Sequence, residues 1–203
     1  MVEEWRNFCL SFLYIPLRKI GLKSILNACD LHPLYSSNIL FKYADDTYLT
    51  VPANNSSLIS QELHSISKWA NDNNLQLNSA KCCEMIVYLP DADRRKVALP
   101  PPRSDVTRVD NITVLGVTFN SMLSFAPHAQ KVASKAAASL YALRILKAHG
   151  LDGQALWEVR QATLEAQQLL YASLAWSGFV KSEERTKLQL ILNKESRYGF
   201  LPA

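Results

Sequence analysis

Residues 39–51, with the sequence ILFKYADDTYLTV, decide the fold of the first part of the chain. Apolar and aromatic side chains alternate with other residues on both sides of two adjacent aspartates, Asp45 and Asp46. Alternation with a period of two residues is typical of β-strands, so the stretch predicts a β-hairpin with both aspartates at its tip. Because adjacent carboxylates repel each other, a divalent cation would stabilise this tip, as Mg²⁺ does at sites of phosphoryl transfer. Aspartate pairs also occur in turns without any metal, because their side chains hydrogen-bond to neighbouring backbone.

The four residues Tyr43-Ala44-Asp45-Asp46 between apolar strands resemble the catalytic hairpin of reverse transcriptases. Further segments, in the order of that family, resemble the reverse transcriptase of non-LTR (LINE-type, jockey-like) retrotransposons: Asp30-Leu31-His32-Pro33, residues 68–75 (KWANDNNL), Asn78, Lys81, Leu115-Gly116-Val117-Thr118, Tyr171-Ala172-Ser173 and Trp176. The resemblance extends from residue 30 to residue 198 and implies part of a polymerase palm followed by a thumb.

Periodicity predicts the elements outside the hairpin. Before residue 125 it predicts a helix over 57–71, which Ser56 or Ser57 can cap, and strands over 84–89 and 111–119. After residue 125 it predicts three helices, which begin at His128, after Asp152 and at Ser182. The second of these helices carries on one face Leu156, Val159, Thr163, Ala166 and Leu170.

These patterns predict an α+β fold. The resemblance makes the expectation more specific: an incomplete polymerase palm over 30–124, with antiparallel strands and a packed helix, and an all-helical thumb over 125–203. Residues 1–29 carry no motif and are unassigned. The apolar stretch 8–15 within them predicts a buried segment or a remnant rather than a signal peptide, because acidic residues precede it and basic residues follow it.

The resemblance implies nucleotidyl transfer, in which the 3′-hydroxyl of a DNA primer attacks the α-phosphate of a dNTP on an RNA template. Two Mg²⁺ ions ~4 Å apart stabilise the attacking and leaving oxygens in this chemistry. Asp45 and Asp46 match the family's metal-binding positions, so Mg²⁺ or Mn²⁺ is the implied cofactor. Lys81 matches a lysine near the leaving pyrophosphate, where it would donate a proton or stabilise charge. A solvated surface lysine fits the sequence equally well.

Four residues are candidates for contact with the template–primer: Tyr43, Gly116, Lys131 and Lys135. Tyr43 precedes the aspartates, and Gly116 matches the primer-grip turn, where a glycine lets the backbone approach a ligand. Lys131 and Lys135 share one helix flank and could contact phosphates. Each also has a structural alternative. Tyr43 could be an ordinary strand aromatic, Gly116 could mark a bulge, and Lys131 and Lys135 could be solvated surface lysines.

The chain departs from the family where catalysis is concerned. The family's palm holds another metal-binding aspartate on an earlier strand, followed by a Gln-Gly-containing motif of the nucleotide pocket. Residues 1–29 contain no aspartate, and that motif is absent from the sequence before the hairpin. We therefore expect a truncated copy that binds Mg²⁺ or Mn²⁺ weakly and does not extend a primer. A non-catalytic nucleic-acid-binding remnant and a domesticated interaction module are the alternatives.

Composition sets the broad class. The 203 residues, 48% hydrophobic and 20% charged, are typical of a globular protein, and no apolar run reaches the length of a membrane span. Four cysteines without a CxxC pair favour a reducing nuclear or cytoplasmic location over secretion, and they argue against zinc. The whole net charge of +4 falls in residues 128–203, which hold 10 basic and 6 acidic side chains. The sequence indicates no oligomeric state.

Overall fold

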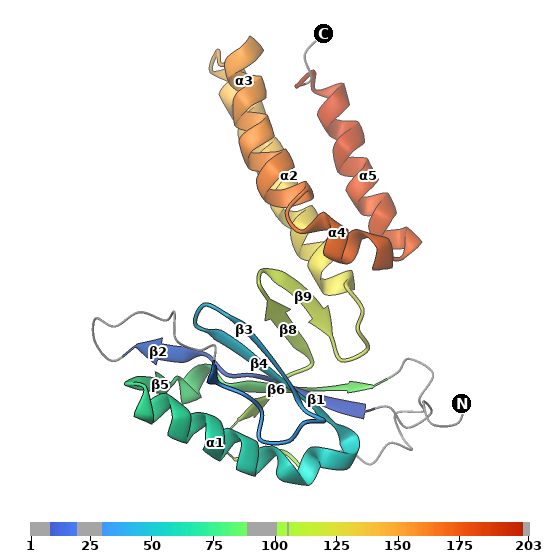
Figure 1. Cartoon of the computed structure of the whole chain (residues 1–203). Helices are drawn as coiled ribbons and strands as arrows, with labels where there is room; N and C mark the ends of the chain where they lie inside the picture. The colour runs from blue at the N-terminus through green and yellow to red at the C-terminus, as the bar shows by residue number, and fades with distance from the viewer. Residues whose placement is uncertain (1–8, 20–29, 89–100, 105, 201–203) are drawn as a thin grey trace. The chain divides into compact units, whose positions relative to one another are not determined.

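The computed structural model describes residues 9–19, 30–88, 101–104 and 106–200. The chain divides into two compact units, Met1–Ile112 with Ser121–Leu123, and Thr113–Asn120 with Ser124–Ala203, and each unit is described by itself. Within the described residues the fold is α+β, as predicted (Figure 1). The first unit carries the main sheet and one long helix, and the second carries a β-hairpin and the remaining helices.

The main sheet has the strand order β3-β4-β1-β6-β7. Its strands are β1 (Cys9–Tyr14), β3 (Ile39–Tyr43), β4 (Asp46–Pro52), β6 (Cys83–Tyr88) and β7 (Thr107–Arg108). Three of its pairs are antiparallel, but β6 and β7 are parallel, so the expected antiparallel sheet is a mixed one. Strand β1 comes from the segment that the sequence left unassigned, and it lies between β4 and β6.

Two shorter pairs of strands complete the β-structure of the described residues. Strand β2 (Leu17–Lys19) pairs with β5 (Leu75–Leu77), which follows the first helix of the chain. Strand β8 (Asn111–Val114) lies beside β9 (Val117–Asn120), and a two-residue turn joins them. The prediction of one strand over 111–119 was therefore wrong. Both turn residues, Leu115 (φ 46°) and Gly116 (φ 85°), have the positive φ of a type I′ turn, which reverses the chain.

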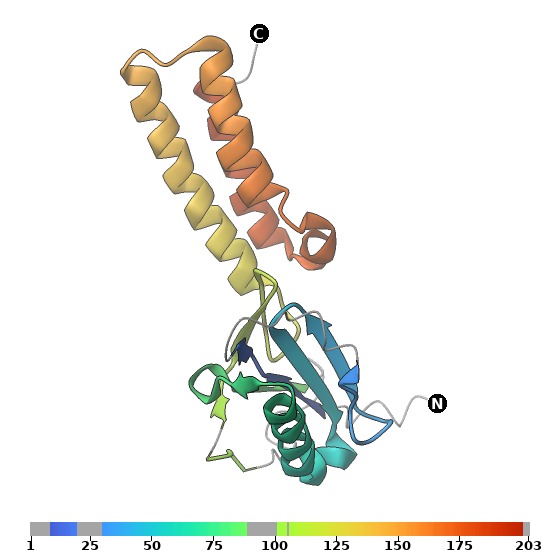
Figure 2. The same ribbon diagram turned by 60° about the vertical axis from the view of Figure 1, so that its left-hand side comes forward.

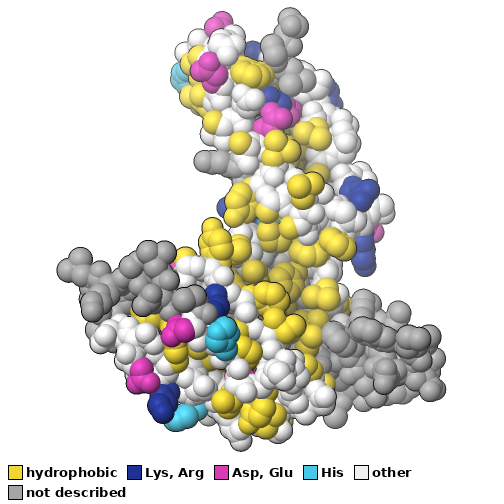
Figure 3. All heavy atoms as spheres, viewed as in Figure 1, with side chains coloured by type: hydrophobic (Ala, Val, Ile, Leu, Met, Phe, Trp, Pro, Cys, Tyr) yellow, Lys and Arg dark blue, Asp and Glu magenta, His cyan; other side chains and the backbone are white. Residues whose placement is uncertain are grey.

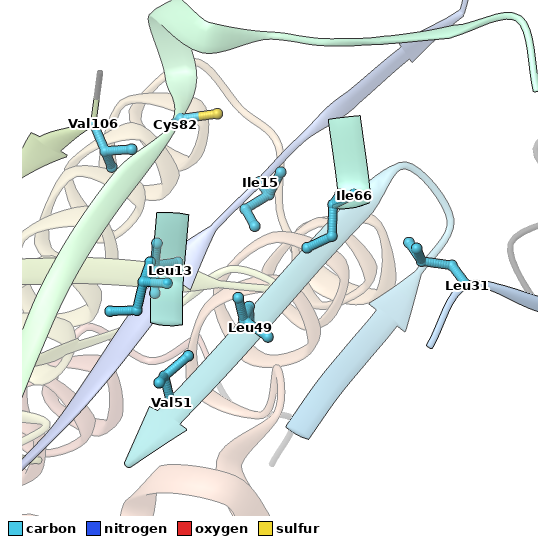
Figure 4. Packing of buried hydrophobic residues seen from close by; sticks show 9 residues of the cluster. Leu13, Ile15, Leu31, Leu49, Val51, Ile66, Cys82 and Val106 are labelled. Carbon is cyan, nitrogen blue, oxygen red and sulfur yellow. The ribbon is translucent and has the colours of Figure 1, made fainter. Parts of the chain in front are cut away.

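Helix α1 (Ile59–Asp72) packs on one face of the main sheet. Leu13 and Leu49 are register partners on β1 and β4, so their side chains share that face, and Ile59 and Ile66 cover them from α1. Figure 4 shows this core, with side chains from β1, β4 and α1 pointing toward one another. Burying each such aliphatic side chain contributes about 1.5–3 kcal/mol, so this packing holds the hairpin strands in the sheet.

The start of α1 differs from the prediction. The 3-10 turn η3 (Ala53–Leu58) leads directly into the helix, and no serine side chain caps it. Glu62, which is fully buried, instead accepts hydrogen bonds from the backbone N–H groups of Leu34 (2.9 Å) and Tyr35 (3.0 Å) and from Asn38 Nδ2 (2.7 Å). This carboxylate fixes the segment that enters β3.

The second unit is a helical bundle with a hairpin at its beginning. Its elements after β9 are α2 (Ala126–Ala148), α3 (Gly153–Arg160), the π-helix η5 (Gln161–Leu169), α4 (Ser173–Trp176), the 3-10 turn η6 (Ser177–Phe179) and α5 (Ser182–Arg197). In Figures 1 and 2, α2, the continuous run of α3 and η5, and α5 lie side by side. Buried residues from all three helical segments form one core cluster, which includes Leu140, Leu156, Leu164 and Ile191.

The buried face of α3 and η5 differs from the predicted one. Leu156, Arg160 and Leu164 are buried, whereas Ala166 and Leu170 are exposed. The helix changes from α to π geometry after Arg160, and the wider π turn shifts the side chains that follow. Arg160 is neutralised inside the bundle by ion pairs with Glu195 and, at 3.2 Å, Glu165.

The surface of the helical unit carries hydrophobic side chains as well as charged ones (Figure 3). Leu174, Phe179 and Leu170 are among the exposed large apolar residues. No helix in the described part of the chain has the length and apolar character needed to span a bilayer.

Candidate functional site

The predicted hairpin forms, and its tip is a tight turn. Tyr43 and Asp46 are direct register partners at the ends of β3 and β4, so only Ala44 and Asp45 make the connection. Ala44 adopts a left-handed backbone (φ 52°), a conformation that costs a non-glycine residue about 1–2 kcal/mol. Asp45 is exposed in the turn, whereas Asp46 begins β4 and is half-buried.

Asp46 has a partner that the sequence did not reveal. The hydroxyl of Tyr14, at the end of β1, donates a 2.6 Å hydrogen bond to Asp46 Oδ1. The Tyr14 ring stacks on Tyr48 with 5.3 Å between ring centroids. Burial raises the pKa of Tyr14 above its ordinary value, and the hydrogen bond to Asp46 and the negative charge of that carboxylate raise it further. Tyr14 is therefore a neutral hydrogen-bond donor at physiological pH.

The side chains at the tip do not fit a two-metal centre. The polymerase palms that the sequence resembles hold the two ions with carboxylates on two separate strands, whereas β1, the strand beside β4, presents Tyr14 here and carries no aspartate. Nowhere among the described residues do three or more histidine, cysteine, aspartate or glutamate side chains form a group that could hold a metal ion. Two adjacent aspartates, one of them held by a phenol, leave the two ions short of ligands.

Aromatic side chains line the face of the sheet opposite α1. Alternation along β3 places Phe41 and Tyr43 on the same face as Asp46, and Tyr43 is 63% exposed. Phe12 and Tyr14 on β1 continue this face and contact the ring of Tyr48. Exposed aromatic rings on a sheet are suited to stacking on nucleic-acid bases, whatever their sequence.

Lys81 is exposed at the end of the 3-10 turn η4 (Ser79–Lys81). The backbone connects this turn to the hairpin tip through one short segment: Asn78 N–H donates to Pro16 O (3.0 Å), and Leu17 N–H donates to Asp45 O (2.9 Å). Within the described residues, no hydrogen bond or ion pair joins Lys81 to either aspartate. The predicted catalytic lysine thus lies in the same unit as the aspartates but is not in contact with them.

A second candidate site lies wholly within the helical unit. Three residues that the sequence singled out, Gly116, Lys131 and Lys135, line one open cleft of about 430 Å³. The other lining residues are His128, Val132, Gln168 and Tyr171. Both lysines are exposed and lie one helical turn apart on α2, and no carboxylate is among the described residues that line the cleft. Its charge is therefore positive, which suits an anionic ligand.

The wall of this cleft joins segments that are far apart in the sequence. The Tyr171 hydroxyl donates a 2.9 Å hydrogen bond to Leu115 O, and Trp176 Nε1 donates to Tyr171 O at 3.1 Å. A Cβ atom added at Gly116 would lie 3.0 Å from Tyr171 Cε1, so even an alanine here would crowd this ring. Residues 115–118 and 171–176, both of which carry the resemblance, therefore meet at one place.

His128, for which the sequence predicts only the start of a helix, also lines the cleft. It is buried, contacts the Trp176 ring edge-on with 4.8 Å between centroids, and accepts a 3.4 Å hydrogen bond at Nδ1 from Thr118 N–H. Burial lowers the pKa of His128, and the charges of Lys131 and Lys135 lower it further. His128 lies three and seven residues before the two lysines, and this spacing places all three side chains on one helix face. That spacing is the sequence signal from which His128 could have been assigned to the cleft.

A second cleft, of about 510 Å³, lies between η5, α4 and α5 and is lined mainly by apolar residues together with Arg160, Glu165, Arg185 and Glu195. None of the predicted site residues lines it.

In comparisons with known proteins, no protein-family model, no curated protein and no solved structure matches the chain. A proposal for the function of the chain therefore rests on the residues of the two candidate sites and on their geometry.

Proposed function

We propose that the chain is a reverse-transcriptase-like fragment, related to the enzymes of non-LTR retrotransposons, that binds nucleic acid without catalysing DNA synthesis. Residues 30–124 correspond to part of the palm and residues 125–203 to the thumb. The partners are an RNA template and a DNA primer, and in the complete enzymes also a dNTP. The proposed location is nuclear or cytoplasmic.

The hairpin tip is the observation that carries this proposal. Tyr43 and Asp46 end the two paired strands, and Ala44 and Asp45 form the turn between them, inside a sheet that α1 covers on one face. The opposite face is rich in aromatic residues and ends at Asp46. A template–primer lying on this face would contact Tyr43 and place its reacting end near the aspartates, which is the arrangement that polymerase chemistry requires.

The cleft in the helical unit supports nucleic acid as the ligand. Phosphate contacts from lysine supply most of the sequence-independent affinity for nucleic acid. Lys131 and Lys135 line the cleft beside the Leu115-Gly116 turn, and neither forms an ion pair with any described residue. A backbone phosphate between two ammonium groups would satisfy both charges.

Catalysis is left out of the proposal because the tip lacks the ligands for two metal ions. The family's reaction depends on carboxylates from two strands, and here one strand offers Tyr14. The same chain can still bind template–primer, since phosphate and base contacts do not require the metal centre.

Fluorescence anisotropy with a labelled RNA–DNA template–primer tests this proposal. We expect binding that weakens as salt rises, and we expect Lys131→Glu combined with Lys135→Glu to lower the affinity and to reduce the slope of log K against log salt by about 2. Lys181→Glu combined with Lys194→Glu, at exposed positions on or beside α5, makes the same change in net charge and serves as the control. The proposal is wrong if the full chain binds no template–primer at low salt, or if both pairs of substitutions reduce binding equally.

A further inference from the structure

Strand β1 brings a tyrosine to the aspartate pair from the neighbouring strand. Tyr14 and Tyr48 are register partners on β1 and β4, and Asp46 lies two residues before Tyr48, so all three side chains share one face of the sheet. Diagonal neighbours of this kind have backbones roughly 7–8 Å apart, which is within reach of a long side chain. The phenol of Tyr14 spans this distance and donates its 2.6 Å hydrogen bond to Asp46 Oδ1.

We propose that Tyr14 occupies the place of the second-strand carboxylate, so that a phenol holds Asp46 where a polymerase palm would use a divalent cation. A neutral phenol supplies a proton to the carboxylate but no negative charge to a metal ion. Mg²⁺ and Mn²⁺ require several oxygen ligands, and hard cations prefer carboxylates. With Tyr14 at this position, the tip keeps one pair of carboxylates, and the phenol occupies Asp46 Oδ1.

The surrounding packing holds Tyr14 in place. Its ring stacks on Tyr48, and Phe12 also contacts the Tyr48 ring, at a centroid distance of 5.7 Å. Backbone hydrogen bonds continue past β1 to the tip itself, from Ile15 N–H to Thr47 O (2.8 Å) and from Leu17 N–H to Asp45 O (2.9 Å). The strand therefore stays paired to the hairpin along its whole length, and a metal ion would have to displace the phenol by rotating a stacked side chain.

The sequence predicts weak metal binding because no aspartate precedes the hairpin on an earlier strand. The structure shows that β1 is an earlier strand next to β4 and that it lacks only the carboxylate. A single substitution should then restore a site. The inference rests on the geometry of the tip and not on nucleic-acid binding, so its test uses Mn²⁺ alone and can fail independently of the proposed function.

Titration of the full chain with Mn²⁺, followed by electron paramagnetic resonance of the free ion, tests the inference. We expect Tyr14→Asp to bind Mn²⁺ at least ten times more tightly than the unaltered chain, and we expect this gain to vanish when Asp46→Asn is added. Tyr141→Asp adds the same charge at an exposed position of the helical unit and should leave the affinity unchanged. Tyr14→Phe removes only the hydroxyl and should raise the affinity about threefold to tenfold, the range that a net hydrogen bond supports.

Three results would overturn the inference. The first is tight binding of Mn²⁺ through Asp46 by the unaltered chain. The second is a folded Tyr14→Asp variant that binds Mn²⁺ no better than Tyr141→Asp. If Tyr14→Asp does not fold, as judged by circular dichroism, Tyr14→Phe decides the question, and an affinity equal to that of the unaltered chain would show that the hydroxyl does not compete with the ion.

Discussion

Gly116→Ala should destabilise the helical unit by about 2–5 kcal/mol, because two separate effects add. The first is backbone strain: Gly116 has φ +85°, and an L-residue in the left-handed region costs about 1–2 kcal/mol. The second is steric: the new Cβ would lie 3.0 Å from Tyr171 Cε1, which is closer than carbon atoms normally approach. Overpacking of this kind costs about 1–3 kcal/mol.

Two other glycines of the same unit separate these effects. Gly150 also has a positive φ (+93°), but nothing lies within 4 Å of its added Cβ, so Gly150→Ala should show only the strain of about 1–2 kcal/mol. Gly178 has neither a positive φ in the left-handed range nor a close neighbour, and Gly178→Ala should leave stability within about 1 kcal/mol of the unaltered chain.

Urea unfolding followed by circular dichroism at the helical band measures all three variants. The order of destabilisation should be Gly116→Ala, then Gly150→Ala, then Gly178→Ala. Equal losses for Gly116→Ala and Gly150→Ala would show that Tyr171 does not pack tightly on the turn, and the reasoning about the wall of the cleft would fail.

Three further predictions concern the rest of the molecule. Glu62→Gln should lower the free energy of unfolding by about 2–3 kcal/mol, because the amide cannot accept all three hydrogen bonds of the buried carboxylate. Hydrogen exchange over residues 31–38 should then become faster, whereas Glu183→Gln, at an exposed position, should leave it unchanged. Because the pKa of His128 is lowered in the folded chain, the unfolded chain binds more protons than the folded one below about pH 6.5. The free energy of unfolding should therefore fall as pH decreases from about 7 to 5, and denaturation at a series of pH values should show a flatter dependence for His128→Gln. In a primer-extension gel with Mg²⁺ or Mn²⁺, the chain should add no dNTP, and incorporation that Asp45→Asn abolishes would contradict the absence of catalysis.

The elements that sequence reasoning found are those in which local pattern and tertiary packing agree. Alternation predicted the hairpin to within a residue at each end, because β4 buries one full row of side chains. Helix α5 also begins at Ser182, as predicted, and it has acidic residues in its first turn and basic residues in its last. The face of α3 and η5 was misjudged, since the π geometry after Arg160 shifts the side chains that follow. The burial of Arg160 also depends on its ion pair with Glu195 of α5, 35 positions away, which no local pattern encodes.

The candidate site divides in the same way. Tyr43, Asp45 and Asp46 could be assigned because they are contiguous, and Gly116, Lys131 and Lys135 were found separately although they line one cleft. Tyr14 was missed because its role depends on β1 pairing with β4, a contact between residues 32 positions apart. Pairing of distant strands is decided by the sheet as a whole and leaves little trace in either strand.

Photo-crosslinking followed by mass spectrometry tests whether the chain binds a template–primer at the hairpin face and at the cleft. The full chain is bound to an RNA–DNA template–primer that carries a photoreactive base and phosphate analogues, and the crosslinked peptides are identified. We expect crosslinks at the exposed hairpin face around Tyr43 and at the cleft around Lys131 and Lys135, and no crosslinks at Lys181 or Lys194. Crosslinks confined to other surfaces, with both of these sites unlabelled, would contradict this expectation.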